Sequence, residues 1–405
     1  MNVQKLQRIA LTFALVVACR ISAGAQQSAQ PSLPSPLQVL KPGAHQPPPT
    51  STPLELNSKA QALISQAKYD EAILLLKQSI SIEPNNAQAY TLLGVAYQQS
   101  KRLDLAIEAF LRLVKLKPDI ALFQNSLGGA LLDYGKPAEA RAAFIRAVEL
   151  DPSDFGSRFG IGSCYLKEKD YEHALDAYQN ALGYNPSSPD VHIALGDVLE
   201  QLERHESSLA EYDAAIRLSP GLPGPVIGRA TALAGLKRNF EAEQLVRALV
   251  AKTPKDPALI SGLAQVLDAV GRHQDAIAQY KAAIKLTPTD GYLWGNLGWA
   301  LYNASRYEES IEAGNKALTI DSTLAYVRFN LGLARIVENR PADADKEYAA
   351  AIKISSAPDI RAAINDLNDS VKRHPSLSLL ISRQIDRLRL AEWKLIGLDP
   401  SLTRH

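Results

Sequence analysis

Proline recurs every 34 residues along most of this 405-residue chain. The repeating prolines are Pro84, Pro118, Pro152, Pro186, Pro220, Pro254 and Pro288. Their surroundings agree, as in "SIEPNN", "ELDPSD" and "KLTPTD", and the segment "TIDSTL" continues the phase with Ser322 in place of proline. A fixed internal period is typical of proteins in which small structural units stack one on the next, so it constrains the fold before any domains are counted.

Two columns of small residues run through the same repeats. When Pro53 is taken as position 1, position 8 is Gly or Ala and position 20 is Ala or Ser in all nine repeats. Position 24 is a large apolar or aromatic residue in most of them. Helices approach each other closely only where the side chains at their contact are small. The columns therefore predict a pair of packed helices in each repeat, with the large residue of position 24 packing against the next repeat.

The junctions between repeats carry helix stop and start signals. Proline lacks a backbone N–H and ends the second helix of a repeat. Two residues later, five junctions hold a residue type that favours helix N-caps. These predicted N-caps are Asn86, Asp154, Ser188, Asp256 and Asp290.

The repeat length, the small columns, the aromatic column and the terminal proline together resemble the tetratricopeptide repeat (TPR) family. The resemblance covers nine repeats over residues 53–358. It implies an all-α, right-handed superhelical solenoid of helix-turn-helix units, with a concave groove lined by the first helix of each repeat. The first repeat departs from the pattern, because Asn57, Lys59 and Leu63 stand where apolar or aromatic residues are expected. We interpret this helix as a polar terminal cap.

The segments before the repeats predict export. Residues 1–25 begin with Lys5 and Arg8, continue with the apolar run "IALTFALVVAC" and end in small residues, which is the order of a secretory signal peptide. The expected location is the periplasm or the medium. An alternative is a membrane-anchored lipoprotein, because the residues up to Cys19 resemble a bacterial lipobox. Residues 26–52 are rich in Pro, Gln and Ser and predict a disordered linker.

The segment after the repeats predicts two C-terminal helices within residues 359–398, followed by a tail at 399–405. In the second helix an apolar face is formed by Leu377, Ile381, Ile385, Leu388 and Leu395. We expect this face to cover the open end of the solenoid. A dimer contact is one alternative, and folding of these helices back onto the repeats is another.

A candidate binding surface emerges from the helical phase of the first helix in each repeat. Positions 2, 5, 9 and 12 share one stripe, and the TPR resemblance assigns this stripe to the groove. In repeats 8 and 9 it carries the aromatic residues Tyr292, Trp299, Tyr302, Tyr326 and Phe329, flanked by Asn296 and Asn330. Trp294, at position 4, is predicted to pack between helices. Exposed aromatic patches usually mark interaction sites.

The rest of the stripe is acidic to neutral. It carries Asp190, Asp197 and Glu200 in repeat 5 and Asp268 in repeat 7, and no Lys or Arg occurs at these four positions in any repeat. This excludes the carboxylate clamp of chaperone-binding relatives, which needs lysines there. A neutral or basic peptide, or a glycan stacked on the rings, suits the stripe better. Ordinary solvated surface is the alternative for the acidic residues.

The sequence offers little for catalysis. The net charge of +1 gives no footprint for nucleic acid, and the histidines lack metal-ligand spacing. Glycines in "RFGIGSCY" fall within a predicted helix and make no phosphate loop, and Cys164 has no placed histidine partner. We therefore expect no enzyme activity, no metal and no cofactor. The predicted function is a non-catalytic protein-interaction scaffold of the bacterial cell envelope. The alternatives are a carbohydrate-binding module and an accessory subunit that organises a cell-wall or secretion complex.

Overall fold

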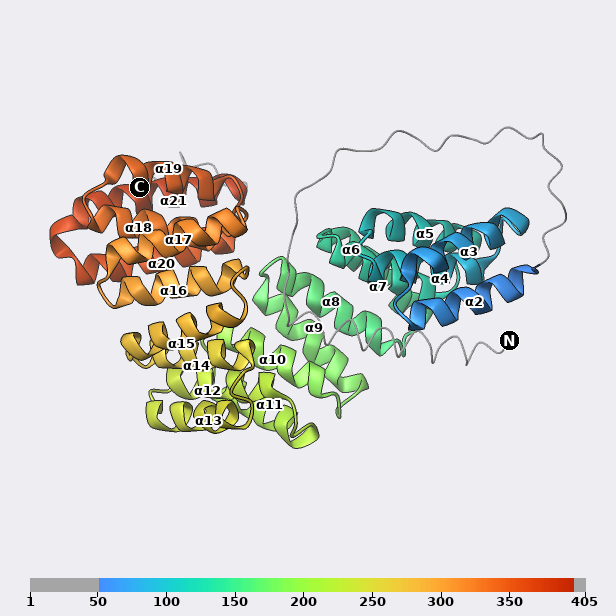
Figure 1. The fold of residues 1–405 in the computed structure, drawn as a ribbon, viewed down its shortest axis with the longest axis horizontal. Helices are drawn as coiled ribbons and strands as arrows, with labels where there is room; N and C mark the ends of the chain where they lie inside the picture. The colour runs from blue at the N-terminus through green and yellow to red at the C-terminus, as the bar shows by residue number, and fades with distance from the viewer. Residues whose placement is uncertain (1–50, 397–405) are drawn as a thin grey trace. The chain divides into compact units, whose positions relative to one another are not determined.

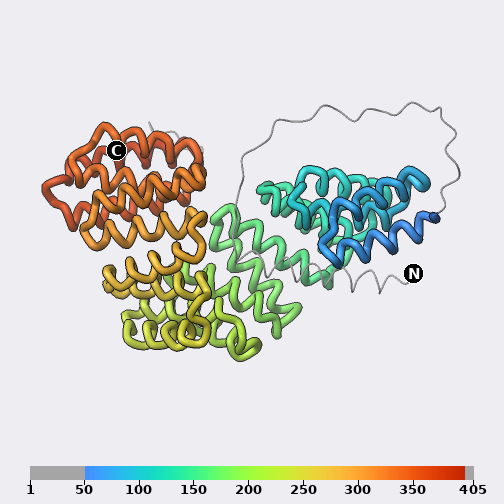
Figure 2. The backbone as a smooth tube through the Cα atoms, in the orientation of Figure 1, coloured from blue at the N-terminus to red at the C-terminus, as the bar shows by residue number. Residues whose placement is uncertain are grey.

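The computed structural model describes residues 51–396, which form 20 α-helices and one short 3-10 helix. Within this range the all-helical repeat array predicted from the period is confirmed, and each repeat is a helical hairpin (Figures 1 and 2). The expected signal peptide, with Cys19, nearly all of the linker and the C-terminal tail lie outside the described residues. The chain divides into two compact units, one ending at Val191 and the other beginning at His192, and each is described by itself.

The helices keep the period of the sequence. The first helix of each repeat, helix A, is in turn α2 (Pro53–Ser65), α4 (Ala87–Gln99), α6 (Ala121–Asp133), α8 (Phe155–Lys167), α10 (Pro189–Gln201), α12 (Pro223–Gly235), α14 (Pro257–Ala269), α16 (Gly291–Asn303) and α18 (Ala325–Val337). The second, helix B, is α3 (Tyr69–Ile82), α5 (Leu103–Leu116), α7 (Pro137–Leu150), α9 (Tyr171–Tyr184), α11 (His205–Leu218), α13 (Asn239–Lys252), α15 (His273–Leu286), α17 (Tyr307–Ile320) and α19 (Pro341–Ile352). Every helix A occupies positions 1–13 of its repeat.

All five predicted N-caps are confirmed. The Asn86 side chain accepts a hydrogen bond from the Ala89 N–H at 3.0 Å, and Asp290 accepts one from the Tyr292 N–H at 2.9 Å. Asp154, Ser188 and Asp256 cap their helices in the same way. These side chains satisfy backbone donors that the first turn of a helix leaves without partners.

Each helix A is followed by a residue in the left-handed region, always at position 15. The nine residues have φ between 55° and 88° and are Ala67, Lys101, Gly135, Lys169, Glu203, Lys237, Gly271, Ser305 and Asn339. The following N–H donates to a carbonyl five residues back, as from Arg102 to Tyr97 at 2.9 Å. This closing turn lets helix B begin after only three residues. Only two of the nine residues are glycine, so the turn does not stand out in the sequence.

In repeats 3 and 5 the aromatic residue of position 24 lies against glycines on both sides. A Cβ atom added at Gly128 of the same repeat would lie 2.8 Å from the Phe144 ring. One added at Gly160 of the next repeat would lie 2.6 Å from it. Tyr212 is held in the same way by Gly196 and Gly228. The predicted packing of position 24 against the next repeat is therefore confirmed. The glycines leave room for the ring because they have no side chain.

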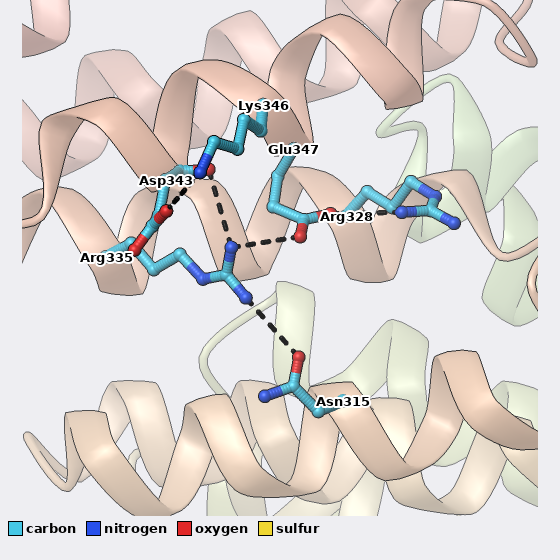
Figure 3. A network of polar contacts seen from close by, with 6 residues as sticks. All are labelled: Asn315, Arg328, Arg335, Asp343, Lys346 and Glu347. Atoms are coloured by element: carbon cyan, nitrogen blue, oxygen red, sulfur yellow. Dashed lines mark hydrogen bonds and ion pairs between the residues drawn. The ribbon is translucent and has the colours of Figure 1, made fainter.

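Ion pairs also connect neighbouring helices (Figure 3). Arg328 and Arg335 of α18 both contact the carboxylate of Glu347 on α19, at 3.1 and 3.0 Å. Arg335 also donates to the side chain of Asn315 on α17 at 3.4 Å. One carboxylate thus joins two arginines within repeat 9, and one of these reaches back to repeat 8.

The expectation of a polar outer face for the first helix is wrong for Asn57. Its side chain is 1% exposed, and its Nδ2 donates to Oδ1 of Asn86 at 3.3 Å. Asn57 therefore faces the junction with the second repeat, where it meets the residue that caps α4. Lys59 is exposed, as a terminal cap requires.

The chain after the repeats forms α20 (Ala357–Arg373), a 3-10 turn (Pro375–Leu377) and α21 (Ser378–Leu395). The apolar face expected on the last helix is confirmed for Ile381, Ile385 and Leu388, which are buried, whereas Leu395 is 53% exposed. α20 packs against α21 and α18, and α21 packs against α19 and α18 (Figure 1). α20 therefore lies along the layer of A helices. No helix within residues 51–396 is long and apolar enough to cross a membrane.

Candidate interaction surface

Positions 2, 5, 9 and 12 of the A helices in the second unit form what we call the helix A surface. The aromatic residues predicted there are brought together as two stacked pairs. The rings of Tyr292 and Tyr326 lie 6.3 Å apart with an interplanar angle of 17°. Those of Trp299 and Tyr302 lie 5.4 Å apart at 14°. Each pair therefore presents one outer ring supported by an inner one.

Two of the five rings are not accessible, and the expectation that all five line an open groove is corrected. Tyr302 is 2% exposed and Phe329 is 5% exposed. Phe329 packs against the ring of Tyr348 at 6.0 Å. Both residues belong to a buried cluster that also contains apolar residues of α20 and α21. The C-terminal helices thus cover this part of the surface, which is one of the alternatives that the sequence leaves open.

The remaining rings keep contact with solvent. Tyr292 is 46% exposed, while Trp299 and Tyr326 are half-buried. The Tyr326 hydroxyl is buried, has no hydrogen-bond partner among the described residues and lies against Gly295, where an added Cβ would meet it at 2.4 Å. Its burial raises the pKa of Tyr326 well above its ordinary value. Trp294 packs between helices as predicted, and its indole N–H donates to the Pro288 carbonyl at 3.0 Å.

The last turn of α20 makes polar contacts with α16. The hydroxyl groups of Ser370 and Tyr302 lie 3.0 Å apart. The guanidinium of Arg373 lies 5.2 Å from the centre of the Tyr302 ring and donates to Oδ1 of Asn303 at 3.2 Å. His374 lies beside Tyr307 of α17, with Nε2 3.4 Å from its hydroxyl. These contacts join residues about seventy positions apart in the chain.

The same network continues to α14. Asn303 donates through Nδ2 to Asp268 at 3.0 Å, and the other oxygen of Asp268 lies 2.6 Å from Nδ1 of His273. The Asp268 side chain is only 13% exposed. Asp268 is therefore part of an internal network and is not an open acidic residue of the surface.

The predicted acidic residues of repeat 5 behave differently from one another. Glu200 is 11% exposed in its side chain and is held by Ser208 and His205, so it is not available to a ligand. Asp197 is exposed and accepts a hydrogen bond from the Tyr212 hydroxyl at 2.7 Å. Protein atoms crowded around its carboxylate reduce its hydration and, with the charge of Glu200, raise the pKa of Asp197 to about 6.

Asp190, Asn296 and Asn330 complete the predicted set. All three are half-buried. Asn296 and Asn330 lie on α16 and α18, one repeat apart. Burial raises the pKa of Asp190 above its ordinary value. Asp190 lies at the start of α10, the helix that also carries Asp197 and Glu200.

Sequence reasoning missed the residues at the end of α20 that meet this surface, namely Asp366, Ser370 and Arg373 and the following His374. A signal was present, because Ile360, Ile364, Leu367 and Val371 recur at helical spacing and predict an apolar face. Periodicity shows that such a face needs a partner. It does not show which of the nine repeats supplies it.

Within residues 51–396 no group of three or more His, Cys, Asp or Glu side chains is placed to hold a metal ion. Burial raises the pKa of the Cys164 thiol to about 12, so this thiol is protonated at neutral pH and a poor nucleophile. What the second unit offers is two supported rings and one open carboxylate.

Comparisons with known proteins agree with this architecture. Family models described as tetratricopeptide repeat match residues 63–127, 126–179, 170–223 and 261–325, which is more than half of the chain. The comparison with curated proteins finds no match. Among solved structures, a TPR protein from Parabacteroides merdae ATCC 43184 is 18% identical with a TM-score of 0.50, over 70% of this chain and 98% of that one.

Two further structures show weaker likeness. PilW, described as a type IV pilus biogenesis factor, is 20% identical with a TM-score of 0.49, over 53% of this chain and 98% of that one. The Cut9–Hcn1 assembly of the APC/C is 19% identical with a TM-score of 0.48, over 82% of this chain and 55% of that one. The family models and the repeat architecture carry the assignment: this chain belongs to the tetratricopeptide repeat family, a family of protein-binding scaffolds.

Proposed function

We propose that this protein is a non-catalytic scaffold of the bacterial cell envelope that holds a peptide or protein segment on the helix A surface of its second unit. The observation that carries this proposal is the pair of supported rings. Tyr292 is 46% exposed and rests on Tyr326, and Trp299 rests on the buried Tyr302. Rings that already pack against a second ring lose little conformational entropy on binding, which makes them good anchors for a partner.

The charge of the surface favours a neutral or basic segment. Asp197 is an open carboxylate, and no Lys or Arg occurs at positions 2, 5, 9 or 12 of any A helix. Many arginines of this unit instead pair with its own carboxylates, as Arg328 does with Glu347. An acidic partner would meet no cation at these positions, whereas a lysine or arginine could pair with Asp197.

A binding experiment with three immobilised full-length proteins tests the proposal. They are the unchanged chain, the Tyr292→Ala/Trp299→Ala variant and a Phe240→Ala control. Phe240 is a suitable control because it is 75% exposed and lies on a B helix, α13. Each is exposed to an envelope extract, and the retained material is identified by mass spectrometry. We expect one protein to be retained by the unchanged chain and the control and lost from the double variant.

Other outcomes separate the alternatives. Retention of a glycan instead of a protein, with the same loss in the double variant, would establish the carbohydrate-binding alternative. Equal retention by all three proteins would rule out the helix A surface as the binding site. Location is tested separately by mass spectrometry of the mature N-terminus. A chain beginning at Gln26 indicates soluble export, and a lipid-modified Cys19 indicates a membrane anchor.

A further inference from the structure

The helix A surface continues under the C-terminal helices, where it already holds a helix. Three apolar side chains of α18 at positions 5, 9 and 12 are 5% exposed or less: Phe329, Leu333 and Ile336. They share one buried cluster with Ile364 and Leu367 of α20. Of the same positions in repeat 7, position 9 is exposed at Gln265, whereas Ser261 at position 5 is buried. α20 therefore occupies a stretch of the surface on which the proposed function rests.

α20 is encoded as a helix by its own local sequence. Ser356 and Asp359 form a reciprocal capping box at its N-terminus, with Pro358 in the first turn. Lys372 and Arg373 lie in its last turn, where positive charge favours a helix. These signals do not depend on contact with α16 or α18, so α20 has local support for its helical form when it leaves them.

The interface between this hairpin and the repeats is incompletely satisfied. Two buried polar atoms there, the Tyr348 hydroxyl and Oε1 of Gln384, have no hydrogen-bond partner among the described residues. Asp366 of α20 is half-buried close to Asp369, with Arg373 as the neighbouring cation, and its burial raises its pKa to about 6. Unpaired buried polar groups oppose association, so the contact is weaker than its apolar area alone would suggest.

We infer that the α20–α21 hairpin is a displaceable occupant, and that the surface beneath it binds an amphipathic helix of a partner protein with an arginine in its last turn. α20 itself defines that chemistry. Apolar residues spaced as Ile360, Ile364 and Leu367 fill the face of α18. An arginine placed as Arg373 stacks over Tyr302 and donates to Asn303. This goes beyond the proposed function, which concerns the part of the surface that is already open.

Hydrogen–deuterium exchange on the full-length protein tests displacement. We expect amides of α20 and α21 to exchange at least tenfold faster than those of α16 and α17, because a displaceable hairpin opens on its own. The Ser370→Ala/Arg373→Ala variant should increase that local rate at least tenfold. Asp366→Asn should slow it, because the charge that opposes docking is removed. Lys372→Ala is the matched control, because the Lys372 side chain is 77% exposed and pairs with Asp369 of its own helix, so the rate should change far less than tenfold.

A labelled synthetic peptide with the sequence of residues 357–374 tests the ligand chemistry on the same full-length proteins. It should bind the Ser370→Ala/Arg373→Ala variant at least tenfold more tightly than the unchanged chain. It should bind the Asp366→Asn variant more weakly than the unchanged chain. The same peptide with its arginine at the position of Arg373 replaced by alanine should bind at least tenfold more weakly.

The two proposals fail in distinguishable ways. If the hairpin exchanges no faster than α16 and α17, or if Ser370→Ala/Arg373→Ala and Asp366→Asn do not shift its exchange and peptide binding in opposite directions, the hairpin is a fixed part of the core and the inference is wrong. Neither result depends on Tyr292 or on the extract experiment. Conversely, loss of the open-surface partner in the Tyr292→Ala/Trp299→Ala variant says nothing about the hairpin.

Discussion

The hydroxyl of Tyr302 on α16 lies 3.0 Å from the hydroxyl of Ser370 on α20, and both side chains are buried. Tyr302→Phe should lower the free energy of unfolding by about 1 kcal/mol, because it leaves the ring in place and removes one partner of a buried hydrogen bond. Tyr302→Ala should cost about 3 to 5 kcal/mol, because it also leaves a cavity. Urea unfolding measures both. A similar loss from Tyr292→Phe, whose ring is exposed, would contradict this assignment.

The left-handed turns at position 15 predict opposite effects for two neighbouring glycines. Gly135→Ala should destabilise by about 1 kcal/mol, because its φ is +88° and an added Cβ would meet no atom within 4 Å, so the cost is one of backbone conformation. Gly129→Ala, within α6 and equally open, should stabilise by about 0.5 to 1 kcal/mol. Thermal or urea unfolding measures both variants. Changes in stability of the same sign would contradict this prediction.

By the same argument Lys101→Gly should stabilise the protein. Lys101 has a φ of 64°, a region that costs about 1 kcal/mol or more for a residue with a Cβ atom. Part of this gain is offset by the greater freedom of glycine in the unfolded chain. We expect a net gain of a few tenths of a kcal/mol to about 1 kcal/mol in urea unfolding. A loss of 1 kcal/mol would show that the lysine side chain contributes more than the turn.

The glycines around the position 24 rings predict a contrast within α12. Gly228→Ala should destabilise by about 1 to 3 kcal/mol, because its Cβ would lie 2.4 Å from the buried ring of Tyr212. Gly224→Ala, in the first turn of α12, should leave stability unchanged or raise it by up to about 1 kcal/mol, since no atom lies within 4 Å of its added Cβ. Equal effects in chemical denaturation would mean that the ring moves aside at little cost.

The Glu347 carboxylate, which two arginines share, should contribute more to stability than an exposed ion pair does. Glu347→Gln should cost about 1 to 3 kcal/mol, because Arg328 and Arg335 are only 22% and 16% exposed and lose their counter-charge. Lys346→Ala removes an ion pair whose lysine side chain is 76% exposed. It should change the free energy of unfolding by less than about 0.5 kcal/mol. High salt should narrow the difference between the two variants, which unfolding curves at two ionic strengths can check.

The raised pKa of Asp366 predicts a dependence of stability on pH. Its pKa is about 6 in the folded protein and 3.8 for an unperturbed aspartate, so the folded state holds the proton more tightly. Between these values the folded state binds more protons than the unfolded one, and stability falls as pH rises from about 4 through about 6. Asp366→Asn should abolish this contribution, making the variant more stable than the unchanged protein by about 1 to 2 kcal/mol at pH 7.

Unfolding curves of the two proteins at several pH values provide the measurement. Asp197 titrates in the same range and is present in both proteins, so its contribution cancels in the difference between them. A difference that does not grow between pH 4 and pH 7 would show that Asp366 is not responsible.

Local chemistry allowed much of the repeat array to be predicted from the sequence. The proline period, the N-caps such as Asn86 and Asp290, and the small columns each act within one repeat or between direct neighbours, so they can be recognised along the chain. The phase of helix A also placed Tyr292 and Trp299 correctly as rings that keep contact with solvent. The left-handed residue at position 15 was missed because seven of the nine carry side chains.

The candidate site was decided by tertiary structure. Whether Tyr302 and Phe329 face a ligand or a core depends on α20, which lies about forty to seventy residues further along the chain and pairs with them only in three dimensions. The same holds for Glu200 and Asp268, whose carboxylates form hydrogen bonds with neighbouring side chains. Helical periodicity determines which face of a helix each residue occupies. Which distant helix covers that face depends on long-range packing, and only the folded chain decides it.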